Sequence, residues 1–202
     1  MWYNEFWLGK HGDAGDAGNV AQQSFTRCRE DEVMKISAIF PVIQDPKAEV
    51  LLVHCLDPRF EWAWIGLPEA LGLEPGESAT ISIAGGPLPL AYPEDCRSRA
   101  KQTAQQLLFA RDKFSRVKQC ILFTHDDCAY YCTIPCHRTG REDLALAGSL
   151  AKSLLPHWEI KLQHVTLFDQ GRQIRFDEIA ISEKIIKPPA YWFKHHKLVH
   201  TP

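Results

Sequence analysis

Two short segments of the chain combine residue types that bind metals and handle protons. In the first, Cys55, Asp57 and Arg59 follow the pattern Cys-x-Asp-x-Arg. In the second, His125 and Cys128 follow the pattern His-x-x-Cys. Two thiolates and one imidazole are a good ligand set for zinc, and three protein ligands leave a fourth position for water or substrate, as catalytic zinc requires. The pattern therefore predicts one Zn²⁺ ion held by the two cysteines and the histidine.

Both segments adjoin short apolar runs that are typical of buried strands. Residues 49–55 are rich in Val and Leu, and residues 118–124 form a second apolar run. Ligands of an open parallel sheet collect outside the carboxyl ends of its strands, so we expect the two segments to meet at one edge of a sheet. His54 alternates to the strand face opposite Cys55 and is therefore not expected to be a ligand.

The rest of the chain alternates predicted strands with predicted helices. This alternation predicts an α/β fold, with a mostly parallel central sheet, flanking helices and an antiparallel edge strand. A Pro-rich loop is expected over residues 87–93. Further strands are expected over residues 78–84, 160–168 and 173–181, and helices over residues 95–113, 141–155 and, briefly, 67–71.

Length and composition are those of an ordinary globular protein. The chain has 202 residues, of which 45% are hydrophobic and 24% charged, enough to bury one sizeable core. We expect an N-terminal arm over residues 1–33, a zinc-binding α/β domain over residues 34–184 and a C-terminal tail over residues 185–202. Within the domain, residues 36–43 are expected to form either a strand or a short helix.

Charge and hydropathy argue against two classes of partner. The 23 basic residues nearly balance the 25 acidic ones, and a net charge of -2 argues against nucleic acid. No apolar stretch approaches the roughly 20 residues that span a bilayer, which argues against a membrane protein. The N-terminus lacks the pattern of a secretory signal, so we expect a cytoplasmic protein whose seven cysteines are reduced.

The two motifs resemble the hallmark pair of the β-class carbonic anhydrases, in which Cys-x-Asp-x-Arg is followed by His-x-x-Cys. Further stretches are similar to segments of that family: Gly-Leu-Glu-Pro-Gly-Glu at 72–77, Ala-Gly-Gly at 84–86, and Val-Thr-Leu-Phe-Asp at 165–169 followed by Gly171. The resemblance covers about residues 48–178. It implies that the chain has a β-carbonic anhydrase-like fold and is a divergent member of the family.

The resemblance also implies an activity and a set of site residues. The expected activity is that of a zinc lyase, which interconverts CO₂ and bicarbonate through a zinc-bound hydroxide. Asp57 and Arg59 would be the catalytic pair, because the guanidinium can hold the carboxylate and aim its free oxygen at the zinc-bound water. A homodimer or larger homo-oligomer is implied as well. The implied substrate-binding residues are Ile83, Ala84, Gly85 and Ala129.

The chain departs from the family pattern at residues that are expected to lie beside the substrate. Ser82 and Ile83 stand where the family has Arg-Asn, and Ala129 stands where it usually has Gly. Two alternatives therefore stay open: a COS or CS₂ hydrolase on the same zinc site, and a non-catalytic zinc-binding or regulatory protein. Asp57 is expected to be either a hydrogen-bond acceptor or a fourth zinc ligand.

Overall fold

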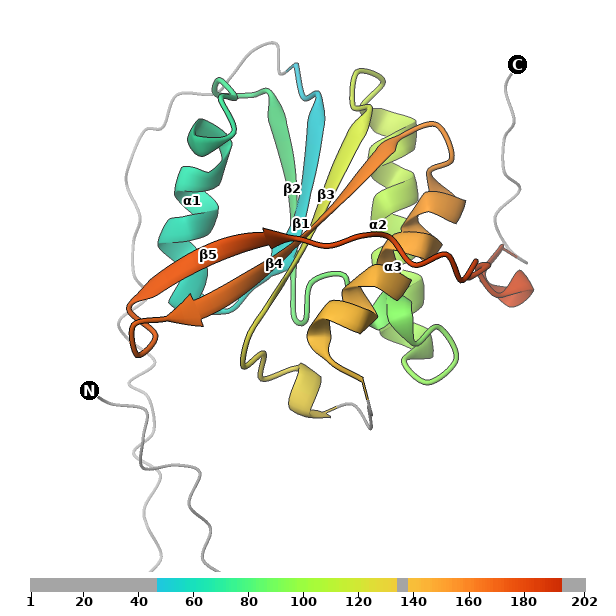
Figure 1. Ribbon diagram of the computed structural model, residues 1–202. Coiled ribbons are helices and arrows are strands. Elements are labelled where there is room, and N and C mark those ends of the chain that lie inside the picture. Colours follow the sequence, from blue (N-terminus) through green and yellow to red (C-terminus); the bar gives the residue numbers. More distant parts are fainter. Residues whose placement is uncertain (1–46, 134–137, 194–202) are drawn as a thin grey trace, which may run out of the picture. The chain divides into compact units, whose positions relative to one another are not determined.

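The computed structural model describes residues 47–133 and 138–193, which form a five-stranded sheet with the order β2-β1-β3-β4-β5 (Figure 1). Strands β2, β1, β3 and β4 are parallel, and β5 pairs antiparallel with β4 at one edge. The predicted fold class is therefore confirmed. The predicted N-terminal arm and the element at 36–43 lie outside the described residues. The strands are β1 Val50–Cys55, β2 Ser78–Ile83, β3 Gln119–His125, β4 Glu159–Phe168 and β5 Gln173–Glu178.

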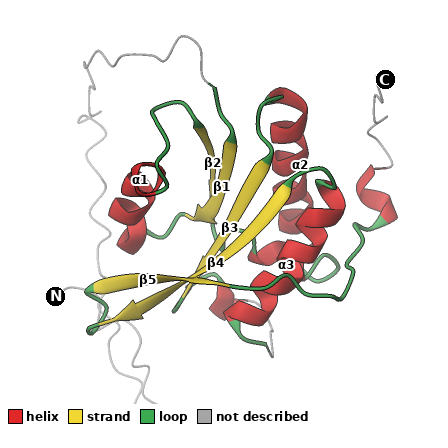
Figure 2. Ribbon diagram, turned by 45° about the horizontal axis from the view of Figure 1, so that its top comes forward, coloured by secondary structure: helices red, strands yellow, loops and turns green. Residues whose placement is uncertain are grey.

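Helices lie on both faces of the sheet. Helices α2 and α3 cover one face, and α1 lies on the other (Figure 2). Within the described parts of the chain, no helix is long and apolar enough to cross a membrane. The α-helices are α1 Glu61–Ala70, α2 Arg97–Lys113 and α3 Gly140–Leu154, and the 3₁₀ helices are Pro58–Phe60, Leu88–Ala91, Tyr131–Thr133 and Ala190–Phe193.

The side chains of β1 alternate between two apolar cores. Val53 belongs to the larger core, which includes residues of α2 and α3, whereas Leu52 belongs to a smaller core beside α1. The next two residues continue the alternation because side chains of a strand point to opposite faces in turn. Cys55 therefore lies on the α2–α3 side of the sheet and His54 on the α1 side.

Helix α1 begins earlier than the sequence predicts. Pro68 favours a short helix over residues 67–71, but the helix begins at Glu61 and ends at Ala70, two residues after the proline. Proline removes one hydrogen bond from the preceding turn, a cost that is smaller near a helix end than in its middle. The earlier turns of the helix place Trp64 against the smaller core, in which Leu67 is buried.

Two other elements also differ from expectation. The Pro-rich stretch predicted as a loop contains the 3₁₀ helix Leu88–Ala91, whose two leucines are completely buried. Helix α2 has Cys96 rather than Asp95 at its N-cap. In contrast, α3 starts with a capping box, in which Thr139 and Glu142 satisfy each other's backbone N–H groups.

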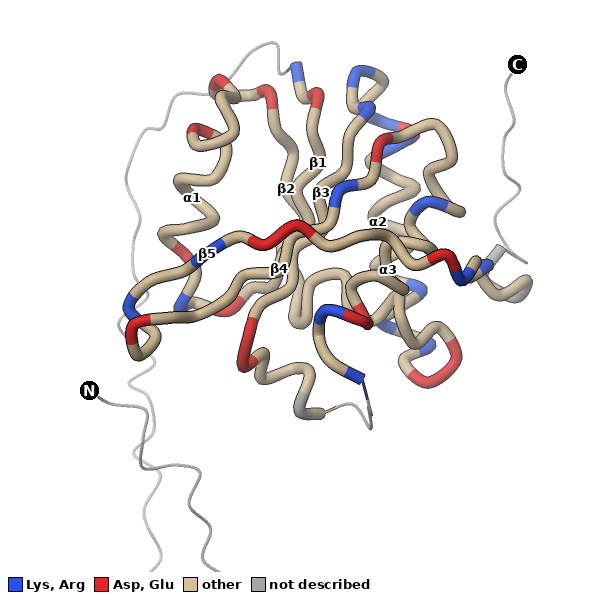
Figure 3. Tube along the Cα trace, viewed as in Figure 1, with Lys and Arg blue, Asp and Glu red and all other residues tan. Residues whose placement is uncertain are grey.

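Basic and acidic residues are interspersed along the described chain (Figure 3), and several of them stabilise the antiparallel β4–β5 hairpin. On β5, the carboxylate of Asp177 accepts hydrogen bonds from Arg175 at 2.7 Å and from Arg141 of α3 at 2.5 Å. The hydroxyl of Thr166 on β4 donates to the same carboxylate at 2.8 Å. Asp177 thus links both hairpin strands to α3.

Candidate metal centre

Three potential metal ligands meet at the carboxyl ends of β1 and β3. Cys55 is the last residue of β1, His125 is the last residue of β3, and Cys128 follows three positions later. Because these strands are parallel neighbours, both ends lie at the same edge of the sheet. The ligand atoms of the three residues all lie within 4.8 Å of one another, and all three residues are buried. We call this group the metal cluster.

The geometry of the metal cluster fits a zinc ion. The two sulfurs are 3.9 Å apart, and tetrahedral zinc with bonds of about 2.3 Å would hold two sulfurs about 3.8 Å apart. The Nδ1–H of His125 donates to the carbonyl of Asp126 at 2.7 Å, so Nε2 carries the free lone pair. That Nε2 atom is buried and makes no hydrogen bond to the described residues. A bound cation would supply the missing partner.

The pKa values of the two thiols are shifted in opposite directions. Hydrogen bonding with Cys128 is the largest influence on Cys55 and, with the nearby His125 and the Gly85 N–H at 3.3 Å, it outweighs burial and lowers the pKa of Cys55 to about 4. The same pairing raises the pKa of Cys128, and burial raises it further. The pair therefore gives up one proton readily and retains the second. A nearby cation is needed for both sulfurs to be thiolates.

An arginine holds a carboxylate beside the metal cluster. Oδ1 of Asp57 accepts from the backbone N–H of Arg59 at 3.0 Å and from its Nε at 3.1 Å, while Oδ2 accepts from its Nη2 at 2.8 Å. Burial raises the pKa of Asp57, but the hydrogen bonds from Arg59 prevail and lower it. Oδ2 lies 4.0 Å from Nε2 of His125, and the group within 4.8 Å does not include Asp57. The carboxylate is thus placed as a neighbour of the cluster.

Arg59 also joins the two motifs. Its Nη2 donates to the backbone carbonyl of Asp127 at 2.8 Å. Asp127 has a positive φ of 53°, where the chain turns from β3 towards Cys128. Aspartate tolerates this left-handed conformation better than most residues. One guanidinium therefore fixes both the carboxylate of the first motif and the turn of the second.

A glycine turn after β2 closes against the cluster. Gly85 has a φ of +79°, and a Cβ at this position would overlap the ring of Tyr130. Gly86 has a φ of +54°, and its Cβ would lie 3.0 Å from the backbone nitrogen of Cys55. Both positions thus require glycine. Tyr130 comes two residues after a proposed ligand, but neither motif marks it as part of the site.

The four expected substrate-binding residues occupy different places. Ile83 pairs in register with Cys55 and shares its face of the sheet. Gly85 is buried and donates to the sulfur of Cys55, which makes it a partner of a ligand. Ala84 and Ala129 are exposed. Of these residues, the structure brings Gly85 directly onto the cluster.

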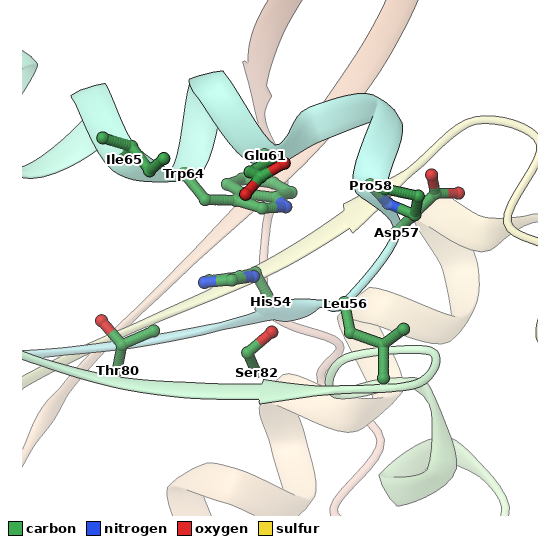
Figure 4. Close-up of a pocket in the computed structure, with 9 residues that line it drawn as sticks. All are labelled: His54, Leu56, Asp57, Pro58, Glu61, Trp64, Ile65, Thr80 and Ser82. Atoms are coloured by element: carbon green, nitrogen blue, oxygen red, sulfur yellow. The ribbon is translucent and has the colours of Figure 1, made fainter. Parts of the chain in front are cut away.

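A separate cavity of about 480 Å³ lies on the other face of the sheet, between α1 and strands β1 and β2 (Figure 4). His54 stacks on Trp64 in this cavity, with ring centroids 4.5 Å apart. Ser82 pairs in register with His54 and lines the same cavity, so it faces away from the metal cluster. Asp57 also lines the cavity. The cavity and the surroundings of the metal cluster therefore meet at Asp57.

Two further polar clusters lie near the second motif. In the first, the Asp126 cluster, His164 of β4 lies between two residues of the β3 end: its Nε2 is 2.9 Å from Asp126 Oδ1, and its Nδ1 is 2.9 Å from Thr124 Oγ1. The second, the Asp143 cluster, consists of Tyr92, Tyr131, Arg138 and Asp143, with the carboxylate of Asp143 completely buried.

No family model and no curated protein matches the chain. Among solved structures, it is similar to a carbonic anhydrase from Glaciozyma antarctica, with 17% identity and a TM-score of 0.46 over 68% of this chain and 85% of that one. It is also similar to β-carbonic anhydrase isoform I from Trichomonas vaginalis, with 14% identity and a TM-score of 0.45 over 69% and 87%. A third similar structure is the β-carbonic anhydrase CafA of Aspergillus fumigatus, with 14% identity and a TM-score of 0.42 over 68% of this chain and 78% of that one. Such low values do not transfer a function, which has to be argued from the site residues.

Proposed function

We propose that the protein is a zinc-dependent enzyme that catalyses the reversible hydration of CO₂ to bicarbonate. The observation that carries the proposal is a buried Cys-His-Cys group with an arginine-held carboxylate beside it. Three protein ligands leave a fourth position for chemistry, whereas structural zinc sites usually have four. The pair of motifs that supplies these residues resembles that of the β-class carbonic anhydrases.

The donor set fits zinc through Cys55, His125 and Cys128. When bound, zinc would supply Lewis acidity that makes hydroxide available from water at mildly alkaline pH. The protein residues around it have separate tasks. Gly85 donates to the sulfur of Cys55, and the carbonyl of Asp126 fixes the imidazole of His125.

Asp57 orients the attacking hydroxyl. Its carboxylate is ionised at neutral pH, so it can accept a hydrogen bond but cannot donate one. A hydroxyl that donates its hydrogen to Asp57 keeps its lone pairs free for the carbon of CO₂. Arg59 fixes the carboxylate in place, so little orientational freedom is lost in the reaction. Phe60 packs against the ring of His125 at a centroid distance of 4.4 Å and covers one side of the ligand.

The test is the CO₂ hydration rate by stopped-flow, from about pH 6.5 to 9, on protein of confirmed zinc content. We expect a rate that rises with pH. Asp57→Asn should lower it by about 10- to 100-fold with zinc content unchanged, because the amide can donate a hydrogen bond where the carboxylate only accepts. The matched control is Glu69→Gln, which removes an exposed carboxylate from α1 outside the cavity lining and should leave the rate unchanged.

Two results would contradict the catalytic proposal. One is zinc-loaded wild-type protein with no rate above buffer at any pH, which would assign the metal a non-catalytic role. The other is an Asp57→Asn protein as fast as wild type. Assaying COS and CS₂ in parallel tests the hydrolase alternative on the same samples.

We also propose that the protein works as a homodimer or larger homo-oligomer. Several large apolar side chains on the α1 side are exposed to solvent: Leu56 at 58%, Trp62 at 84% and Ile65 at 62%. Exposed apolar surface of this kind favours association. Light scattering at micromolar concentration should give at least twice the mass of the chain, and a monomer would contradict the proposal.

A further inference from the structure

We infer that Asp126 and His164 are positioning residues for the metal ligand His125. The inference rests on the metal site of the proposed function. Neither residue belongs to the metal cluster itself. Together they hold the carbonyl group that fixes the imidazole ring of His125.

The link to the ligand is a single hydrogen bond. Nδ1–H of His125 donates to the carbonyl oxygen of Asp126 at 2.7 Å. This bond sets both the tautomer and the rotation of the ring, so the direction of the Nε2 lone pair follows the position of that carbonyl. Displacement of the carbonyl would turn Nε2 away from the two sulfurs.

Strand β4 holds Asp126 at three points. The backbone N–H of Asp126 donates to the carbonyl of Val165 at 3.0 Å. Its Oδ2 accepts from the N–H of Leu167 at 3.0 Å, and its Oδ1 lies 2.9 Å from Nε2 of His164. The next residue, Asp127, turns with a positive φ, so regular β-pairing ends here. Beyond the end of β3, hydrogen bonds to the side chain of Asp126 therefore take the place of regular β-pairing. They keep the chain attached to β4 at the residue whose carbonyl holds His125.

The hydrogen-bond partners assign one tautomer to His164. The carboxylate of Asp126 only accepts, so Nε2 carries the hydrogen. In the neutral ring, Nδ1 then accepts from the hydroxyl of Thr124 at 2.9 Å. His164 is buried and joins β3 to Asp126 through these two bonds. An apolar replacement of similar size would lose both bonds and keep the packing.

Two variants of His164 and one control separate positioning from general stability. His164→Leu removes both hydrogen bonds, whereas His164→Gln can keep a donor near the position of Nε2. The control is Ser149→Ala on α3, because Ser149 is also buried and also makes two hydrogen bonds, to the carbonyl of Lys184 and from the N–H of Ile186.

The readouts are zinc affinity by competition with a chelator and the visible spectrum of the Co²⁺-substituted protein, which reports ligand geometry. We expect His164→Leu to weaken zinc binding about 10- to 100-fold and to change the Co²⁺ bands. His164→Gln should restore most of the affinity and the bands, and Ser149→Ala should match wild type. Thermal unfolding of each metal-free protein checks that all samples compared are folded.

Unchanged zinc affinity in His164→Leu, or an equal loss in Ser149→Ala, would overturn the inference, because the Asp126 cluster would then only stabilise the sheet. If His164→Leu does not fold, Asp126→Asn and Asp126→Ala replace it. The asparagine amide can keep the bonds to Leu167 and His164 through a tautomer change, and alanine cannot, so only the alanine variant should bind zinc weakly. Wild-type protein that binds no zinc would instead overturn the proposed function, and this inference with it.

Discussion

Two buried polar clusters differ in whether the protein alone completes their hydrogen bonding. In the Asp143 cluster, the carboxylate accepts from Tyr92 and Tyr131 at 2.6 Å and from Arg138 at 2.5 Å. In the metal cluster, Nε2 of His125 makes no hydrogen bond to the described residues. Buried polar groups are usually paired, so the unpaired nitrogen needs an explanation and the satisfied carboxylate does not. Burial of polar groups therefore does not mark a functional site by itself, whereas a convergent set with a missing partner does.

Breaking the metal cluster should have the largest effect. A protein with Cys55→Ala and Cys128→Ala is expected to fall from about one zinc ion per chain to almost none, because one imidazole cannot hold zinc against a chelator. Cys120→Ala is the matched control, since this thiol is buried outside the cluster and burial raises its pKa. Metal analysis after dialysis against a chelator measures the difference. Full zinc content in the double variant would place the metal elsewhere.

Breaking the Asp143 cluster should lower the stability of the fold and have little effect on zinc affinity. Asp143→Ala is expected to lower the free energy of unfolding by about 2–3 kcal/mol, because two tyrosine hydroxyls and a guanidinium lose a buried acceptor. Zinc affinity should change far less than in the double cysteine variant, because all three zinc ligands remain and the two clusters are linked indirectly, through Tyr131, which also packs against Cys55 and Cys128. Urea unfolding of the metal-free protein and chelator competition test the two halves of this prediction. A large loss of zinc affinity with an unchanged free energy of unfolding would contradict the structural role of the Asp143 cluster.

Asp177 provides a surface counterpart to both clusters and should show the smallest effect. Hydrogen bonds from Arg175, Thr166 and Arg141 hold its pKa well below the usual range. A depressed pKa stabilises the fold above the unfolded-state pKa of about 3.9, and this contribution is lost as the pH falls towards the folded-state value. Asp177→Asn should therefore lower the urea midpoint slightly at pH 7, with the difference narrowing below about pH 4.

The control for Asp177→Asn is Asp169→Asn, which removes a carboxylate from the turn of the same hairpin. This control leaves the hydrogen bonds of Asp177 in place, so the stabilisation that they provide should remain. A difference between wild type and Asp177→Asn that stays constant from pH 7 down to about 2 would show that the ion pairs are not its source.

The parts of the structure that depend on local pattern could be predicted from the sequence. The apolar runs at 49–55 and 118–124 correspond to β1 and β3, and alternation along β1 places Cys55 and His54 on opposite faces. Parallel pairing then brings Cys55, His125 and Cys128 together, as the two motifs predict. These features need only strand period and strand direction.

Features that depend on contacts across the fold could not be predicted. Asp126 and His164 are 38 positions apart, and their contact follows from the β3–β4 register, which neither motif encodes. Tyr130 becomes part of the site because its ring fits the space left by Gly85. The start of α1 at Glu61 is likewise accompanied by a tertiary contact, since Trp64 in its first turns packs against the smaller core.

The pairing of β1 with β3 also determines when during folding a metal can bind. Cys55 and Cys128 are 73 positions apart in sequence, and their sulfurs approach each other only once these two strands are adjacent. Contacts of such long sequence separation form late, because closing the intervening loop costs entropy before the contacts compensate. Interactions that are absent from the folding transition state slow unfolding and leave the folding rate almost unchanged. An ion held by Cys55, His125 and Cys128 would therefore bind after these strands pair, and its effect would be seen in the unfolding rate rather than in the folding rate.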